Sequence, residues 1–373
     1  MVYLFNSGYR SGYQINLLNT LSYPNGWINY YRYTFTNTEQ YVDPGLVNDY
    51  LSMVDEPALI VAIDRFATNG YVYHPIRKGL IKSCYQDGDR LIFNVELKEY
   101  IYPINNTAFN QDLITSFPDL PRLTNNDPQS RNDGHYAVTG SDLIGDSGKF
   151  KIGVPAWDNM TDQLAATSTY SAKANDETVF TRLSLDLSPT IIKSETDDRI
   201  NFSSLYKLRK GKTYKVAFSF KYPGQQGNAS VMLNLSGKDS LRIETGDTIE
   251  LNTRSDYREI KFTPKRFADE KTETLRFSFT RPTTTTPFNF NSPRIAFELK
   301  MHSGWDFWLQ VLLTTTFWVG STLLIGIDYT KVTPPLTWQS VVAFLTYWKI
   351  GASILNAVIL IWMFRLWGGK KPS

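Results

Sequence analysis

The side chains that could carry chemistry are a lone cysteine, three histidines and a scattered set of carboxylates. Cys84 could act as a nucleophile with His74 or His135 as its base, because a thiol needs a neighbouring group to accept its proton. A single cysteine is more commonly a small core residue, and three scattered histidines do not have the spacing of a metal site. We therefore predict no catalytic residue, no metal and no cofactor at these positions.

A pair of carboxylates could provide acid and base catalysis, since these roles require only two such groups that converge. Surface and turn positions are the commoner explanation. The candidates are Asp43, Asp49, Asp55, Glu56, Asp64, Asp186, Glu195, Asp197 and Asp198. The sequence contains no phosphate-binding glycine loop, dinucleotide fingerprint or nucleophile elbow. We predict that the chain is not an enzyme, with a membrane-bound enzyme acting on a sugar or lipid as the less favoured alternative.

Two groups of basic residues could bind an anionic ligand. Arg77 and Lys78 follow a His-Pro pair, and Arg209, Lys210 and Lys212 surround a predicted turn. Clustered cations attract anions and lipid head groups. The alternative interpretation of each group is a solvated hairpin tip, and the sequence leaves both open.

Composition limits the class of protein. The chain has 373 residues, which is enough for about two domains with separate cores. Lysine and arginine number 39 against 36 carboxylates, so the formal net charge is only +3. Such a small basic excess argues against a nucleic-acid-binding role. The single cysteine excludes an internal disulfide.

Strand patterns dominate the first 300 residues. Residues 1–104 are predicted to form a β-rich (α+β) module, and residues 105–170 an irregular connection. Residues 171–300 contain eight short runs separated by turn residues, which predicts an antiparallel, jelly-roll-like β-sandwich. Residues 208–221 resemble a strand entry of jelly-roll carbohydrate-binding modules, which does not imply a sugar ligand. The predicted fold class is therefore mainly β.

The C-terminal residues have a different composition. Seven of the nine tryptophans lie at or after residue 305, and residues 307–327 carry no charge. A helix of that length would measure about 32 Å, enough to cross a hydrocarbon core of about 30 Å. Pro334 and Pro335 separate this run from a second apolar run. We predict a transmembrane helical hairpin in residues 305–367, with helices at about residues 306–327 and 340–366.

Lys349 lies in the second predicted helix and could have a function in the membrane. Because 15 uncharged residues follow it, its side chain could reach the interface from the outer end of the helix. Alternatively, Lys349 faces a pore or pairs with Asp328. Asn356 is a further polar candidate in the same helix. The two interpretations of Lys349 stay open.

Small residues spaced four positions apart would let the predicted helices approach closely or self-associate. These helix-packing candidates are Thr316, Gly320, Thr322, Gly326, Ser353 and Ala357. Basic residues flank the hairpin at both ends, which predicts cytoplasmic termini and a location in the inner membrane. The N-terminus shows no secretory signal. The predicted partners are the lipid bilayer, further copies of the chain and a partner protein.

A β-rich cytoplasmic region on a two-helix anchor resembles the two-transmembrane effector proteins of bacterial anti-phage defence systems. The resemblance is one of architecture, rests on residues 305–367 and transfers no functional residue. It implies a sensor or effector whose β domains bind a partner or ligand and control a self-associating hairpin that disrupts the membrane. The alternative function is a passive membrane-anchored adaptor that binds a partner protein.

Overall fold

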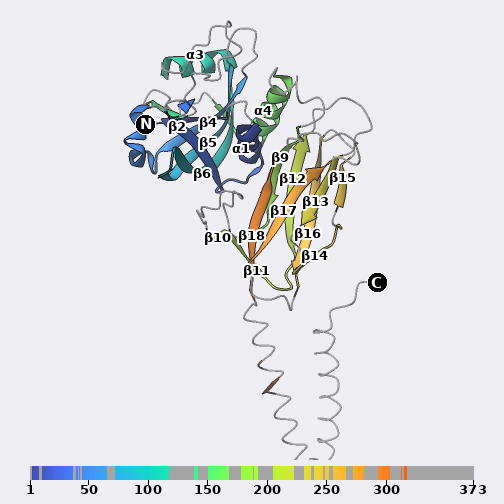
Figure 1. Ribbon diagram of the computed structural model, residues 1–373. Helices are drawn as coiled ribbons and strands as arrows, with labels where there is room; N and C mark the ends of the chain where they lie inside the picture. The colour runs from blue at the N-terminus through green and yellow to red at the C-terminus, as the bar shows by residue number, and fades with distance from the viewer. Residues whose placement is uncertain are drawn as a thin grey trace, which may run out of the picture. The chain divides into compact units, whose positions relative to one another are not determined.

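The computed structural model describes the chain in segments (Figure 1). These are residues 2–7, 11–36, 39–40, 42, 44–64, 72–116, 138–141, 150–167, 178–187, 189–191, 205–221, 231–236, 239–246, 248–251, 255–265, 272–280, 293–302, 312 and 315–316. Within them the chain forms three β-sheets, four α-helices and one 3-10 helix. The prediction of a mainly β chain is therefore confirmed.

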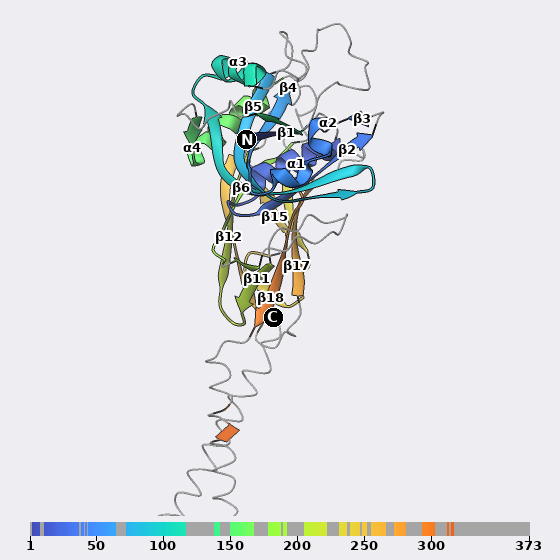
Figure 2. The same cartoon turned by 90° about the vertical axis from the view of Figure 1, so that its left-hand side faces the viewer.

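The first sheet belongs to what we call the N-terminal module, the described residues between 2 and 167. Its strand order is β3-β2-β6-β5-β4-β1-β7, and β8 pairs with β6. β1 and β4 run parallel, whereas the other pairings are antiparallel. The strands are β1 (Val2–Ser7), β2 (Ile28–Thr36), β3 (Glu39–Gln40), β4 (Pro57–Asp64), β5 (Val72–Asp87), β6 (Arg90–Pro103), β7 (Val138–Ser141) and β8 (Phe150–Ile152). Figure 2 shows the long hairpin of β5 and β6, which turns at Gly88.

This sheet is strongly curved. Phe5 in β1 and Tyr31 in β2 have ring centroids 5.6 Å apart, although β4, β5 and β6 lie between them in the strand order. In a flat sheet, four strand spacings would separate them by about 19 Å. The first helix, α1 (Ser11–Ser22), contacts the concave face, where the hydroxyls of Thr20 and Tyr31 are 2.5 Å apart. The sheet therefore curls around α1.

Both faces of the sheet are covered by helices. On the concave face, α1 and α4 (Val154–Ala166) share a core with Ala62, Ile76 and Tyr100 of the sheet. On the other face, α3 (Asn106–Ser116) packs Phe109 and Leu113 against β1, β4, β5 and β6. The remaining helical elements, α2 (Pro44–Val47) and the 3-10 helix η1 (Tyr50–Met53), precede β4. The alternating side chains of β4 explain the two cores, because successive residues of a strand face opposite sides.

The β-sandwich is made of two further sheets, in residues 180–302. The strand orders are β10-β11-β18-β17-β13-β15 and β14-β16-β12-β9. Phe218 in β12 and Phe277 in β17 meet between the sheets with ring centroids 6.5 Å apart. The strands are β9 (Phe180–Leu185), β10 (Pro189–Ile191), β11 (Leu205–Arg209), β12 (Tyr214–Lys221), β13 (Val231–Ser236), β14 (Leu241–Ile243), β15 (Thr248–Leu251), β16 (Ser255–Pro264), β17 (Thr272–Thr280) and β18 (Ile295–His302).

The structure differs from the sequence-based prediction within residues 105–170. An irregular connection was expected there, whereas the described parts contain α3, β7, β8 and α4. The helix α3 begins after Asn105, whose side-chain Oδ1 accepts a hydrogen bond from the Ala108 N–H at 3.1 Å. This bond is an N-terminal cap, and the capping residue Asn105 is a local signal for the start of the helix.

The predicted C-terminal transmembrane hairpin needs correction. Among the described residues, no helix is both long and apolar enough to span a membrane. Most of residues 306–327 and all of residues 340–366 lie outside the described part of the chain. The prediction rested on hydropathy, which measures how well a helix would partition into lipid and not whether a helix forms. The described part of the chain therefore has no transmembrane hairpin, and this part of the predicted fold class is wrong.

Candidate functional site

The Arg77 side chain in β5 is fully buried and makes hydrogen bonds through all of its N–H groups. Nη1 donates to the carbonyls of Thr20 and Tyr23 at 2.8 and 2.5 Å, at the C-terminal end of α1. Nε and Nη2 donate to the Lys98 carbonyl at 2.9 and 2.6 Å, and Nη2 also donates to Asn25 Oδ1 at 2.6 Å. A guanidinium has five N–H groups, so these five bonds leave none for a ligand.

The surroundings of Arg77 explain how a charge is tolerated in the core. Its Cζ lies 4.2 Å from the centroid of the Tyr100 ring, a cation–π arrangement. Burial lowers the pKa of Arg77, and interactions with Tyr100, Tyr31 and Glu99 oppose this effect. Carbonyl oxygens at the end of a helix carry partial negative charge, which also favours a cation. Arg77 thus fixes the end of α1 to the sheet, and its predicted role as an anion ligand is wrong.

The residues that follow this fixed helix end contact the β-sandwich. The carbonyl of Arg294, directly before β18, accepts a hydrogen bond from the Tyr23 hydroxyl at 3.4 Å. The N–H of Arg294 donates to Asn19 Oδ1 at 2.9 Å. Trp27 Nε1 donates to the hydroxyl of Tyr206 in β11. We call these five residues, Asn19, Tyr23, Trp27, Tyr206 and Arg294, the joint.

The aromatic side chains of the joint form a continuous buried cluster, with neighbouring rings tilted against one another. The ring centroids of Tyr23 and Trp27 are 4.9 Å apart, and those of Trp27 and Tyr206 are 5.9 Å apart. All three side chains are at most 3% exposed. Burial raises the pKa of the Tyr23 hydroxyl, so this group stays a neutral hydrogen-bond donor. The joint therefore combines apolar packing with three directed hydrogen bonds.

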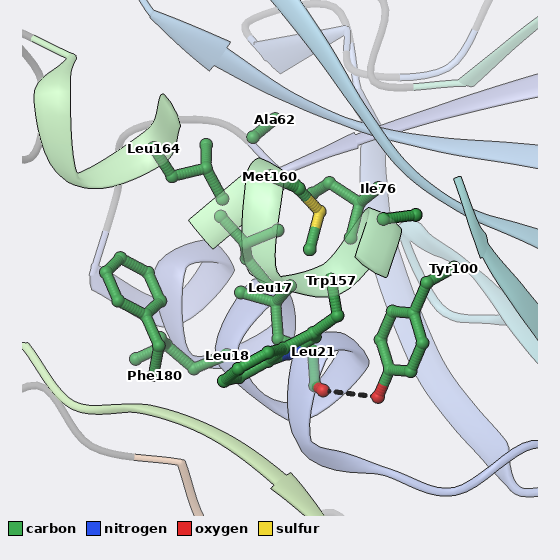
Figure 3. Close-up of a cluster of buried hydrophobic side chains, with 11 residues drawn as sticks. Leu17, Leu18, Leu21, Ala62, Ile76, Tyr100, Trp157, Met160, Leu164 and Phe180 are labelled. Atoms are coloured by element: carbon green, nitrogen blue, oxygen red, sulfur yellow. Dashed lines mark hydrogen bonds between the residues drawn. The ribbon is translucent and has the colours of Figure 1, made fainter. Parts of the chain in front are cut away.

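A second contact between the N-terminal module and the sandwich is centred on α4 (Figure 3). Phe180 of β9 packs in the same core as Leu17, Leu18 and Leu21 of α1 and Trp157 of α4. In Figure 3 the Tyr100 hydroxyl donates to the Leu21 carbonyl, at 2.6 Å. One core thus includes side chains from the sheet, both helices and the sandwich.

Charged side chains of the sandwich also contact α4. Lys221 Nζ donates to Asp162 Oδ1 at 2.7 Å and to the Asp158 carbonyl at 3.1 Å. The Cζ of Arg182 lies 5.1 Å from the centroid of the Trp157 ring. Through these contacts α4 touches both the curved sheet and the β9–β12 edge of the sandwich.

His74 lies in the contact between β5 and α4. It pairs with Ala62 of β4, so its side chain faces the concave side of the sheet, as does that of Asp64. The side chain is 4% exposed, and neither ring nitrogen makes a hydrogen bond of normal geometry. Burial lowers the pKa of His74, whereas the nearby Asp64 and Gln163 side chains act in the opposite direction. Burial therefore favours the neutral form of the imidazole.

Of the two nucleophile–base pairs considered from the sequence, Cys84 with His74 does not form, and His135 lies outside the described residues. Cys84 and His74 lie ten residues apart on the same strand, β5, which places them about 30 Å apart. The Cys84 side chain is buried, and burial raises the pKa of its thiol to about 12. Cys84 is therefore a core residue and not a nucleophile. Within the described residues, no group of three potential ligands forms a metal site.

The other predicted anion-binding residues lie at different places. Lys78 is half-buried in β5. Arg209 ends β11, and the Lys210 N–H donates to the His302 carbonyl at 2.9 Å. Lys212 is exposed, with its Nζ 5.5 Å from the centroid of the Tyr214 ring. Anion binding by these four residues stays a prediction.

The candidates in the predicted membrane helices fall almost entirely outside the described residues. Thr316 is described, as an exposed helical residue. The others are Gly320, Thr322, Gly326, Asp328, Lys349, Ser353, Asn356 and Ala357, which lie outside the described part of the chain.

Comparison with known proteins gives little similarity. No protein family model and no curated protein matches the sequence. A conjugative transposon lipoprotein from Bacteroides eggerthii is 16% identical over 32% of this chain and 95% of its own, with a TM-score of 0.20. A family 123 glycoside hydrolase from Clostridium perfringens is 8% identical over 34% of this chain and 27% of its own, with a TM-score of 0.23. TM-scores this low carry no argument about fold or function.

None of the five residues of the joint belongs to a motif that predicts a function from the sequence. Tyr23 and Trp27 flank a Pro-Asn-Gly turn, and a turn with two large aromatic residues beside it is a signal for a buried contact. No local signal identifies Tyr206 or Arg294, because their role depends on which segment of the N-terminal module lies against them.

Proposed function

We propose that the chain is a recognition protein whose N-terminal module binds a partner or ligand. The change in conformation that follows binding is transmitted to the sandwich strands that lead toward the C-terminal residues. One observation carries this proposal: α1 and the turn after it hold both the N–H and the carbonyl of Arg294, the residue directly before β18. A change in the position of α1 would therefore act on the start of that strand.

The proposed route begins at Arg77. Its side chain ties the sheet to the carbonyls of Thr20 and Tyr23, so the turn after α1 follows the sheet. The same turn contacts β11 through Tyr206 and reaches β18 through Arg294. The ends of β11 and β18 are joined by the hydrogen bond from Lys210 to His302. These two strands therefore respond together.

The proposal leaves out membrane disruption. That step required the transmembrane hairpin, which the described part of the chain lacks. A role in anti-phage defence, self-association and a location at the inner membrane stay predictions from the sequence. The alternative function, a passive adaptor, would use the same surfaces without transmission, and the following experiment separates the two.

Hydrogen–deuterium exchange of the full-length chain tests the transmission. Arg77→Lys keeps the charge but cannot make five hydrogen bonds in the same geometry, so the turn after α1 should open more often. Each 1 kcal/mol lost corresponds to about fivefold faster exchange through opening. We expect faster exchange in α1 and the turn, and also in the peptides of β11 and β18.

Gly79→Ala is the matched control, because it disturbs the same strand but retains the Arg77 side chain, and the atoms nearest the new Cβ belong to β4 and β6. A Cβ at position 79 would lie 2.6 Å from Val95 Cγ1 in β6. We expect this variant to exchange faster in β5 and β6 but not in β11 and β18. If Arg77→Lys changed α1 alone, the chain would be a passive adaptor and the proposed transmission would be wrong.

A further inference from the structure

We propose that the contact between His74 and α4 is an acid-sensitive latch, which releases α4 from the sheet when the imidazole takes up a proton. The proposal deepens the proposed function and rests on it for its consequence, since α4 carries one of the two contacts between the N-terminal module and the sandwich. The latch itself can be tested separately.

The geometry around His74 favours the neutral ring. The imidazole is enclosed between β4, β5 and α4 and is 4% exposed. Gln163 of α4 faces it, and the buried Oε1 of Gln163 likewise makes no hydrogen bond of normal geometry. Burying a neutral imidazole without strong hydrogen bonds costs much less free energy than burying a protonated one, because the charged form loses much more hydration free energy.

Few charges are available to compensate a protonated His74. From β4, Asp64 faces the ring and favours the charged form. From α4, the Asp162 carboxylate is engaged by Lys221, at 2.7 Å. On β5 itself, the nearby cation Arg77 donates its N–H groups to α1, the turn after it and β6. Asp64 is thus the carboxylate that favours the charged form of His74, and desolvation of the ring outweighs its effect.

The sign of the pH effect follows from this balance. When α4 is released, His74 is hydrated and has a pKa near the ordinary value of about 6.5. When α4 is packed, burial holds the pKa lower. The released form has the higher pKa and therefore binds a proton more tightly than the packed form. As the pH falls below about 6.5, acid shifts the equilibrium toward release, by up to about tenfold for each unit of difference between the two pKa values.

Release of α4 would weaken the contact with the sandwich. Trp157 shares the core with Phe180 of β9, and Arg182 lies over the Trp157 ring. Lys221 of β12 would lose its bonds to Asp158 and Asp162. The joint does not involve α4, so it would remain. Acid would thus loosen one of the two contacts and keep the other.

Hydrogen–deuterium exchange in α4 tests the latch, with rates corrected for the intrinsic effect of pH. Between pH 7.5 and 5.5 we expect the corrected opening of α4 in the full-length chain to rise severalfold, up to a limit of about tenfold, because pH 5.5 lies one unit below the ordinary pKa of about 6.5. His74→Gln stays neutral at both values and should show no such rise. His302→Gln, which removes a histidine at the end of β18, should behave as the unaltered chain.

Two outcomes would overturn the latch: constant opening of α4 in the unaltered chain, or the same rise in His74→Gln. If His74→Gln does not fold, titration of the imidazole ring by NMR in the unaltered chain decides the matter. The His74 ring should titrate at a pH below the ordinary value of about 6.5, and a normal titration would contradict the proposal. Failure of the transmission would show separately, as unchanged exchange of β11 and β18 in Arg77→Lys at pH 7.5.

Discussion

Arg77 donates a hydrogen bond to the main-chain carbonyl of Tyr23 at 2.5 Å, although 54 positions separate the two residues in the chain. The bond joins the middle of a central strand to the turn that contacts the sandwich. Carbonyl groups at the end of a helix lack partners within the helix. Arg77 supplies these partners from the sheet, and in doing so it determines the direction in which the chain leaves α1.

Replacing Arg77 by methionine should cost about 3–5 kcal/mol of unfolding free energy. Methionine fills part of the volume but removes the Arg77 donors from the carbonyls of Thr20 and Lys98 and leaves that of Tyr23 with the bond from the Tyr100 hydroxyl at 3.3 Å. Urea unfolding followed by circular dichroism measures the loss. Lys82→Met is the control, because Lys82 is exposed and pairs with the exposed Asp55. A loss as small as that of the control would mean that the Arg77 bonds contribute little.

Gly79→Ala should destabilise the N-terminal module by about 1–3 kcal/mol. The new Cβ would lie 2.6 Å from Val95 Cγ1 and 3.3 Å from the Glu96 carbonyl oxygen. The double variant Gly79→Ala, Val95→Ala removes the closest methyl group. In a double-mutant cycle, a favourable coupling between the two changes is expected, whereas additive losses would contradict the clash.

Phe180→Ala should cost about 3–5 kcal/mol, since it leaves a cavity in the core shared by α1, α4 and the sandwich. The loss should be accompanied by faster hydrogen exchange in α1 and α4. Leu183→Ala is the matched control on the same strand: it is buried too, but its side chain alternates with that of Phe180 to the other face of the sheet. Exchange in α1 and α4 that rises equally in both variants would disagree with a shared core.

Cys84 should not react with thiol reagents in the folded chain at pH 8. Burial raises the pKa of the thiol to about 12, so very little thiolate is present, and the side chain is 5% exposed. Modification by an aromatic disulfide reagent, followed by absorbance, should proceed at a normal rate only in denaturant. Rapid modification of the native chain would show that β5 opens near Cys84.

Much of the β structure could be predicted from residues that lie close together in the sequence. The run from residue 58 to 64 is the buried strand β4, and the Asp87-Gly88 signal marks the turn of the β5–β6 hairpin. Eight runs in residues 179–299 correspond to strands β9 and β12 to β18. These predictions succeeded because alternation along a strand and the backbone freedom of glycine at positive φ are local properties.

The helices were harder to predict from local signals. α1 contains Gly12 and several Ser, Asn and Thr residues, which are weak helix formers, and it is held by packing inside the curved sheet. In residues 150–157 the strand β8 covers only Phe150–Ile152, and a helix follows it. Gly153 has a φ of 107°, and α4 begins directly after it with Pro155 in its first turn.

What the sequence by itself determined is the mainly β character of the chain and the position of most strands, because each depends on the pattern within a few residues. The tertiary structure decided the roles of the charged and polar side chains. Arg77 and Lys78 are neighbours in the sequence, yet Arg77 is buried against α1 and Lys78 is only half-buried. Burial and hydrogen-bond partners come from segments distant in the chain, such as α1 for Arg77, α4 for His74 and the turn after α1 for Arg294. No local pattern encodes those distances, so only the folded chain shows which polar groups face solvent and which hold its parts together.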